Sequence, residues 1–177
     1  MKGIMFNTKY GLEQAVLRGD KTRTWRADAK PRYEVGEIVA IKQSYKTLLD
    51  NDKEHCREVG ITNSYGFVYC HWIEQTGWDN KMFVKTEIMP HQIRIVGIKP
   101  CYLQDLTERE ALDEGIEKCT KNIFGGNLSS HRYTFLNAKM FSTSAVLAFA
   151  YLIEKLNGRG YWYSNPKGYA YEFELVK

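Results

Sequence analysis

The residues best suited to chemistry lie near the start of the chain, in the segment 19–26, GDKTRTWR. This segment holds three cations and two threonine hydroxyls within eight residues. A strand or helix that only buries apolar surface carries Val, Ile or Leu at alternating or helical spacing, whereas here Trp25 is the sole large apolar residue. The composition therefore predicts a functional site that binds a polar or anionic group.

The positive charge of the chain is concentrated around this segment. Lys and Arg total 25 against 21 Asp and Glu, a net charge of +4. Residues 1–46 hold ten cations and five acids, and the remainder holds 15 and 16. Such asymmetry favours an anionic partner, for which nucleic acid or a nucleotide phosphate is the usual candidate. A solvated basic face is the alternative.

Length and composition indicate one globular domain over residues 1–177, because 44% of the residues are hydrophobic and the length suits a single core. No apolar run approaches the roughly 18 residues that span a bilayer, and residues 1–6 are too short and too soon polar for a signal peptide. We therefore expect a cytoplasmic protein without a membrane partner.

The four cysteines, Cys56, Cys70, Cys101 and Cys119, form no C-x-x-C pair, which predicts reduced, mostly buried thiols. The sharpest metal alternative combines the neighbouring pairs 55–56 and 70–71, each one His and one Cys. Adjacent residues on a strand point to opposite faces, and zinc ligands are usually two to four residues apart. No metal and no organic cofactor is predicted.

Helices and strands that would position the basic segment follow from periodicity and stop signals. A strand at 3–6 is followed by a helix at 10–18, which ends at Gly19 and delivers the segment. A loop at 27–36 leads to a strand at 37–43. Later elements are a strand at 92–99, a helix from the capping box at 107–110 to near 115, a helix at 146–156 and a strand at 169–176.

Two stretches fit this pattern poorly. Residues 44–90 are predicted to be an insertion with a β-hairpin around 65–72 and a strand at 82–84. Residues 117–142 have no clear period and are predicted to form a long loop. Five or more strands with few helices and no regular β-α-β alternation predict an α+β fold, built on a mixed or mainly antiparallel sheet or small barrel.

Several short motifs resemble the ASCH domain, a family related to the PUA barrels of pseudouridine synthases and archaeosine transglycosylases. They are GxKTxTxR at 19–26, GEIV at 36–39, LQDLT at 103–107 and AxxEG at 111–115. The segments WxxNP at 162–166 and YEFE at 171–174 are similar to the closing part of longer ASCH proteins from bacteria and their phages. The resemblance thus covers both ends of the chain.

This resemblance implies a small PUA-like β-barrel with flanking helices and a cleft for RNA, a nucleoside or a nucleotide. One branch of the family is an amidohydrolase that removes the acyl group from N4-acylated cytidine. The positions matching its catalytic residues are Lys21, Thr24 and Glu114, and Arg26 matches a motif arginine that contacts substrate. Another member is described as a ribonuclease.

Further substrate-binding candidates follow from charge and from the resemblance: Arg23, His91, Arg94, Trp162 and Asn165. Aromatic faces such as that of Trp162 serve as platforms for nucleobases, but a core tryptophan beside an Asn-Pro turn is the alternative. The chain departs from the amidohydrolase branch by its insertions at about 44–90 and 117–142. Trp25 also stands where longer family members have a second arginine.

Amide hydrolysis needs a nucleophile, a base that activates it and a proton donor for the leaving amine. Thr24, Lys21 and Glu114 fill these roles in turn, provided that burial or neighbouring cations depress the pKa of Lys21. Positions 21 and 24 converge only if Lys21 lies in the turn after Gly19. An exposed strand for Lys21 and Thr24, and a solvent-facing helix end for Glu114, are the alternatives.

Two functions of different class remain. The first is a hydrolase of an acylated or otherwise modified nucleoside, in which Lys21, Thr24 and Glu114 meet in one pocket. The second is a non-catalytic RNA-binding module, in which Lys21, Arg23 and Arg26 contact phosphates. The hydrolase requires convergence of the three side chains and a depressed lysine pKa, whereas the binding module requires neither.

Overall fold

The computed structural model of the protein describes residues 1–119, 132–138 and 140–176. Its chain forms two compact units. The first unit consists of Met1–Phe6, Ile38–Arg94 and Val176, and the second consists of the described residues within Asn7–Glu37 and Ile95–Leu175. The assignment of 1–177 to a single domain stays a prediction.

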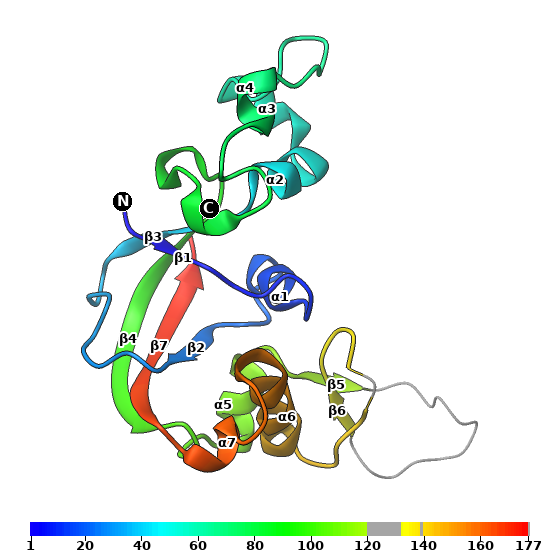
Figure 1. Cartoon of the computed structure of the whole chain (residues 1–177). Helices are drawn as coiled ribbons and strands as arrows, with labels where there is room; N and C mark the ends of the chain where they lie inside the picture. Colours follow the sequence, from blue (N-terminus) through cyan, green and yellow to red (C-terminus); the bar gives the residue numbers. More distant parts are fainter. Residues whose placement is uncertain (120–131, 139, 177) are drawn as a thin grey trace. The chain divides into compact units, whose positions relative to one another are not determined.

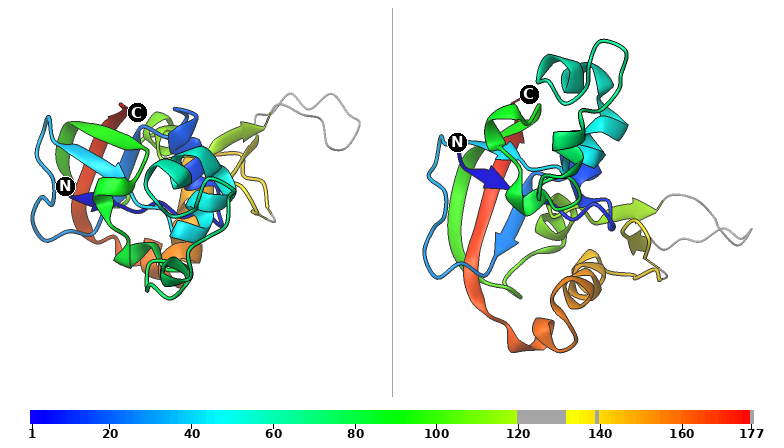
Figure 2. Two further views of the ribbon diagram at one scale, coloured as in Figure 1. Left: turned by 90° about the horizontal axis from the view of Figure 1, so that it is seen from above. Right: turned by 45° about the horizontal axis from the view of Figure 1, so that its top comes forward.

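A five-stranded sheet of mixed sense is the main β-structure (Figure 1). Its order is β1 (Gly3–Ile4), β3 (Ile38–Ile41), β4 (Gln92–Tyr102), β7 (Lys167–Leu175) and β2 (Arg23–Arg26). β1 runs parallel to β3, whereas the pairs β3–β4 and β2–β7 are antiparallel. Figure 2 shows β7, in red, between the green β4 and the blue β2.

The α+β class is confirmed, but the expected closed barrel is not what the described residues form. β1 and β2 are the two edges of the sheet and do not pair with each other. β1 is only two residues long, and β2 has four, which leaves little backbone for a closing ladder. The described sheet is therefore open.

The first unit is mainly helical over the predicted insertion. Its elements are α2 (Tyr45–Asn51), α3 (Lys53–Glu58), α4 (Cys70–Ile73) and the short 3₁₀ turns η1 (Lys81–Phe83) and η2 (Thr86–Ile88). Side-chain caps explain where two of the helices begin: Ser44 accepts a hydrogen bond from Thr47 N, and Asp52 accepts one from His55 N. An uncharged core joins these elements; it includes Tyr45, Leu48, Cys56, Ile61, Trp72, Val84 and Met89.

The β-hairpin predicted around 65–72 and the strand predicted at 82–84 are wrong. A single antiparallel bridge joins Thr62 to Val68, and α4 begins two residues later. The side chain of Asn63 accepts hydrogen bonds from Tyr65 N and Phe67 N, both at 3.0 Å. This Asn-centred turn satisfies the backbone that a longer β-ladder would have used.

Helices of the second unit are α1 (Leu12–Leu17), α5 (Glu108–Asp113), α6 (Ala145–Asn157) and α7 (Tyr161–Ser164). The capping box of α5 is confirmed, with Thr107 and Glu110 binding each other's backbone, and α6 ends at Gly158 as predicted. Glu108 accepts a hydrogen bond from Ala145 N at 2.6 Å, which ties α5 to the start of α6. The two helices lie side by side in Figure 1.

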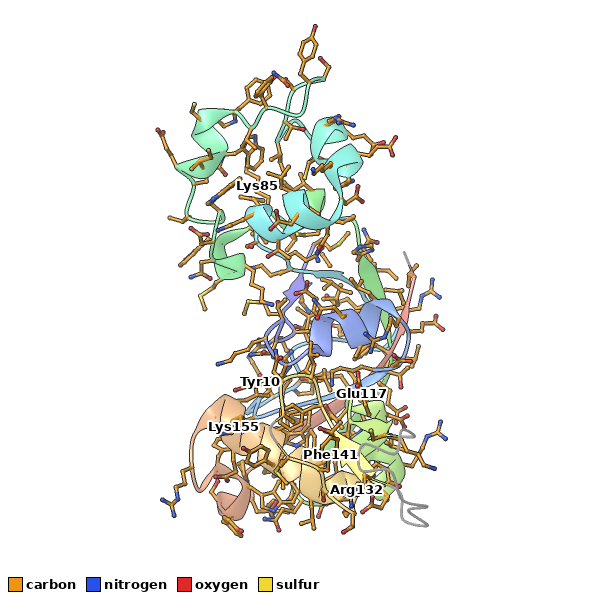
Figure 3. All side chains as sticks on the ribbon, turned by 90° about the vertical axis from the view of Figure 1, so that its right-hand side faces the viewer. Tyr10, Lys85, Glu117, Arg132, Phe141 and Lys155 are labelled. Atoms are coloured by element: carbon orange, nitrogen blue, oxygen red, sulfur yellow. The ribbon has the colours of Figure 1, made fainter. Side chains whose placement is uncertain are left out.

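The long loop predicted at 117–142 contains a two-stranded antiparallel sheet of β5 (Glu117–Cys119) and β6 (Arg132–Thr134). Each strand has three residues, too few for alternation to be recognised in the sequence. The rest of the predicted loop, 120–131 and 139, lies outside the described residues. Glu117 and Arg132 are labelled in Figure 3.

No helix within the described part of the chain is long and apolar enough to cross a membrane. All four cysteines are free thiols; Cys56 and Cys101 are buried, Cys119 is half-buried and Cys70 is exposed. Burial therefore holds for two of the four, although the sequence predicted it for most of them.

Candidate active site

The turn between α1 and β2 fixes the backbone of Lys21. Gly19 has a φ of +80°, a conformation that glycine adopts without strain. The amides of Asp20 and Lys21 then both donate to Ala15 O, at 2.9 and 3.1 Å. Because these bonds close the end of α1, Lys21 lies in the turn after Gly19, the position that convergence with Thr24 required.

The Lys21 side chain is buried, with 2% of its surface exposed. Its ammonium donates to Arg23 O at 2.7 Å, Glu114 O at 2.7 Å and Glu114 Oε2 at 2.9 Å. Three acceptors match the three hydrogens of an ammonium group. Lys21 is thus neither the solvated residue nor the edge lysine that the alternative predicted.

Glu114 occupies the C-terminal end of α5 and is 3% exposed. The next residue, Gly115, has a φ of +97°. A Cβ atom there would lie 3.3 Å from Lys21 Cδ and 3.2 Å from Leu12 Cδ2, so both conformation and space favour glycine. The chain turns back at this glycine, and the Glu114 carboxylate points inward rather than into solvent.

Arg23, on β2, is a second buried cation that binds Glu114. Its Nη1 donates to Glu114 Oε1 at 2.8 Å, and its Nη2 lies 3.8 Å from Glu110 Oε1. The side chain is 4% exposed. Lys21, Arg23 and Glu114, named here the Lys21 cluster, therefore place two buried cations on one buried carboxylate.

Burial lowers the pKa of the Lys21 ammonium, because the charged form is removed from water. The carboxylate of Glu114 acts in the opposite direction and raises it, whereas Arg26 and Arg23 lower it further. The net direction is downward, because burial is the largest of these effects. A lysine in this setting gives up its proton more readily than one in water.

Thr24 is buried, with 5% of its surface exposed, but it alternates with Arg23 along β2. Successive strand side chains point to opposite faces, so Thr24 lies on the face away from Arg23. Its neighbour across the ladder is Tyr171. The structure therefore joins Lys21 to Glu114 directly, whereas Thr24 lies on the other side of the strand. The convergence of all three side chains that a hydrolase with Thr24 as nucleophile required is thus not found.

A second polar group lies on the Thr24 face. The Tyr171 hydroxyl donates to Asp28 Oδ2 at 3.0 Å and accepts a hydrogen bond from Arg32 N at 3.0 Å. Burial raises the pKa of this hydroxyl, and the carboxylate of Asp28 also raises it. Tyr171 thereby anchors the loop that follows Arg26. Arg26 itself is half-buried and pairs in register with Tyr169.

The remaining predicted binding residues lie elsewhere. Asn165 Oδ1 accepts a hydrogen bond from Gln104 N at 2.9 Å, a structural role. Trp162 packs edge-on against Phe149, with ring centroids 6.3 Å apart. Trp162 also lines a cavity of about 510 Å³ together with Met140, Phe141, Ser142, Thr143, Leu147, Ala150, Tyr151, Glu154 and Tyr163.

His91 and Arg94 belong to the first unit and are not part of the Lys21 cluster, which forms within the second. The His91 carbonyl accepts a hydrogen bond from Ile41 N at 2.9 Å. Arg94 is exposed on β4 between the buried Ile93 and Ile95, as the predicted alternation requires.

Two smaller cavities flank α1 and α6. The first has a volume of about 490 Å³ and is lined mainly by paired charges, including Arg18, which donates to Asp20 at 2.7 Å and to Glu117 at 3.1 Å. The second, of about 210 Å³, is lined in part by Tyr10 and Lys155, which are labelled in Figure 3. Neither cavity is lined by Lys21, Arg23 or Glu114.

Within residues 1–119, 132–138 and 140–176, no group of three or more His, Cys, Asp or Glu side chains is arranged to hold a metal ion. His55 Nε2 instead lies 2.7 Å from Ile88 O. Cys56 is buried, whereas Cys70 and His71 are exposed.

Sequence reasoning missed that Arg23 is a buried partner of Glu114 and that Glu110 stands near it. It assigned Arg23 to substrate. The sequence did contain a signal for this contact. Glu110 and Glu114 are four residues apart at the end of a helix, so they share one face of it and can both bind cations of a neighbouring segment. The sequence does not show which helix meets which strand.

No protein-family model, curated protein or solved structure significantly matches the chain.

Proposed function

We propose that the chain is an ASCH domain with a PUA-like fold that binds a modified nucleoside and hydrolyses its amide. The observation that carries the proposal is the Lys21–Glu114 pair, with Nζ and Oε2 2.9 Å apart and both side chains nearly inaccessible to water. An ionised pair in such a place is expensive to bury and is weak evidence of stability alone. Perturbed, buried titratable groups are more common at functional sites.

The chemistry follows from the lowered pKa of Lys21. In its neutral form, Lys21 accepts a proton from a water molecule while the water oxygen bonds to the amide carbonyl carbon. When the carbon–nitrogen bond breaks, the leaving amine takes a proton back from the Lys21–Glu114 pair. The acyl group leaves as a carboxylic acid. For an N4-acylated cytidine the products are cytidine and that acid.

The resemblance to the amidohydrolase branch assigns the role of nucleophile to Thr24, but the alternation of β2 turns Thr24 away from the Lys21 cluster, so we assign that role to water. Thr24 and Arg26 share one face of β2. Arg26 is the cation of the basic segment that we assign to substrate binding.

Burial disfavours the alternative of a binding module that uses Lys21, Arg23 and Arg26 as phosphate contacts. Lys21 and Arg23 are 2% and 4% exposed and hold Glu114. Phosphate contacts of nucleic-acid-binding proteins lie at the surface, where counterions are released. Only Arg26, which is half-buried, keeps a surface suited to that role.

The test is incubation with N4-acetylcytidine and a panel of other acylated nucleosides, followed by chromatography of the products. We expect turnover by the wild type, and at least a hundredfold loss, about 3 kcal/mol of barrier, in Lys21→Met. A similar loss in Thr24→Ala would instead support Thr24 as the nucleophile. Lys30→Met is the matched control, because Lys30 is an exposed lysine of the same unit. It should retain wild-type activity.

Absence of turnover on every substrate would contradict the hydrolase. Salt-sensitive RNA binding that is weakened by Arg26→Ala would then support the non-catalytic module instead.

A further inference from the structure

The Glu114 carboxylate is divided between two cations. Arg23 Nη1 binds Oε1 at 2.8 Å and Lys21 Nζ binds Oε2 at 2.9 Å, so each cation takes one oxygen. A guanidinium group is a permanent cation, whereas an ammonium group can lose its charge. The strength of the Lys21–Glu114 interaction therefore depends on how much of the carboxylate Arg23 holds.

Two further charged groups act on this arrangement. Glu110 Oε1, on α5, lies 3.8 Å from Arg23 Nη2 and 3.9 Å from Lys99 Nζ, on β4. Arg26, on β2, lowers the pKa of Lys21 electrostatically. Arg23 contacts both Lys21, through its carbonyl, and Glu114, through its guanidinium.

We propose that Arg23 is a positioning residue: by holding one oxygen of Glu114 it keeps that carboxylate from neutralising Lys21 alone, and so sets the ease with which Lys21 releases its proton. Its backbone carbonyl also fixes the ammonium, at 2.7 Å. The effect on protonation stands on this geometry alone. Only its consequence for the rate of hydrolysis rests on the proposed function.

The direct test is an NMR titration of lysine-labelled protein, following the Lys21 side-chain nitrogen and its attached methylene. The signal is assigned by its loss in Lys21→Met. In Arg23→Gln, the titration midpoint of Lys21 should rise by about one pH unit or more, since Glu114 then faces one close cation. Arg23→Lys keeps a positive charge and should stay nearer to wild type.

A folded Arg23→Gln protein with an unchanged Lys21 midpoint would overturn the proposal. This readout needs no substrate, so its failure is distinct from a failure of the proposed hydrolysis. If the hydrolysis also holds, the alkaline shift should appear in the pH profile of kcat, while a merely structural role would lower kcat without moving the profile.

A second variant protects the test against misfolding of Arg23→Gln. Glu110→Gln leaves the Lys21 cluster in place but removes the carboxylate that shares Arg23, so Arg23 should hold Glu114 more strongly and the Lys21 midpoint should fall. Glu117→Gln removes the same charge from an exposed position of the unit and serves as the control. Equal shifts in the two variants would also overturn the proposal.

Discussion

The two units bury different kinds of side chain. In the first, the core packs around Tyr45, Leu48 and Trp72, and none of its described buried residues is charged. In the second, Lys21, Arg23 and Glu114 are buried as ions beside the apolar residues. Apolar burial stabilises a fold directly, whereas buried ions repay their loss of hydration only when the geometry is good.

This difference indicates where the chemistry of the chain lies. The helical segment of the first unit buries apolar side chains, as a segment that only stabilises the fold would do. The second unit keeps a charged cluster that hydrophobic side chains of similar volume would often replace without loss of stability. We therefore place the proposed activity in the second unit, and the predictions below test this contrast.

The largest effect on stability is expected from Glu114→Gln. It leaves Lys21 and Arg23 buried without their shared counter-ion, so the free energy of unfolding should fall by about 3–5 kcal/mol. Urea denaturation measures this change. Glu110→Gln, at a half-buried carboxylate of the same helix, should cost less than about 1 kcal/mol. Similar losses in both variants would contradict the special status of Glu114.

Leu48→Ala tests the uncharged core of the first unit. Leu48 is fully buried, and removal of its side chain should lower the free energy of unfolding by about 3 kcal/mol through lost burial and the cavity left behind. The matched control is Leu147→Ala, since Leu147 is 58% exposed; it should change stability by less than about 0.5 kcal/mol. A small loss in Leu48→Ala would mean that this core is loosely packed.

The pH dependence of the free energy of unfolding should differ between the wild type and Lys21→Met. Because folding lowers the pKa of Lys21, the unfolded chain binds more protons between the two pKa values, and stability rises with pH up to about 10.4, the unfolded value. The gain is at most about 1.4 kcal/mol per pH unit. Urea denaturation from neutral to alkaline pH should show the wild type gaining relative to Lys21→Met. Parallel pH profiles would show that the Lys21 pKa is not lowered.

The smallest effect is expected at the aromatic turn of the first unit. Tyr65 and Phe67 are 84% and 71% exposed, so replacing either by Ser should change the free energy of unfolding by less than about 0.5 kcal/mol. Asn63→Ala, which removes the acceptor of two backbone hydrogen bonds, should cost more, about 1 kcal/mol. The reverse order would show that the aromatic side chains, not Asn63, hold the turn.

Elements with a strong local signal were predicted correctly. α6 followed from its apolar stripe and Gly158, and α5 from the capping box of Thr107 and Glu110. Strands with clear alternation, such as β4 and β7, were also predicted. The helices of the first unit were missed, because α4 has only four residues and the turn at Asn63 depends on a side-chain acceptor that periodicity does not detect.

The candidate site was only partly predictable. Lys21 and Glu114 were paired through the resemblance, and the structure brings them into contact. The burial of Arg23 was missed, because a cation in a polar segment normally predicts a surface contact. The contact partner of a side chain depends on how the strand and helices assemble, and no local pattern records that.

The contact between Lys21 and Glu114 joins positions 93 residues apart in the chain. During synthesis Lys21 therefore emerges long before its carboxylate, and until then it is an ordinary hydrated ammonium. β7, whose Phe173 N donates to Thr22 O at 2.8 Å, is made later still. Because the contact between such distant positions needs most of the second unit, the lowered pKa of Lys21 would arise only when that unit is nearly finished. An incomplete chain would hold the same lysine with the pKa of a lysine in water.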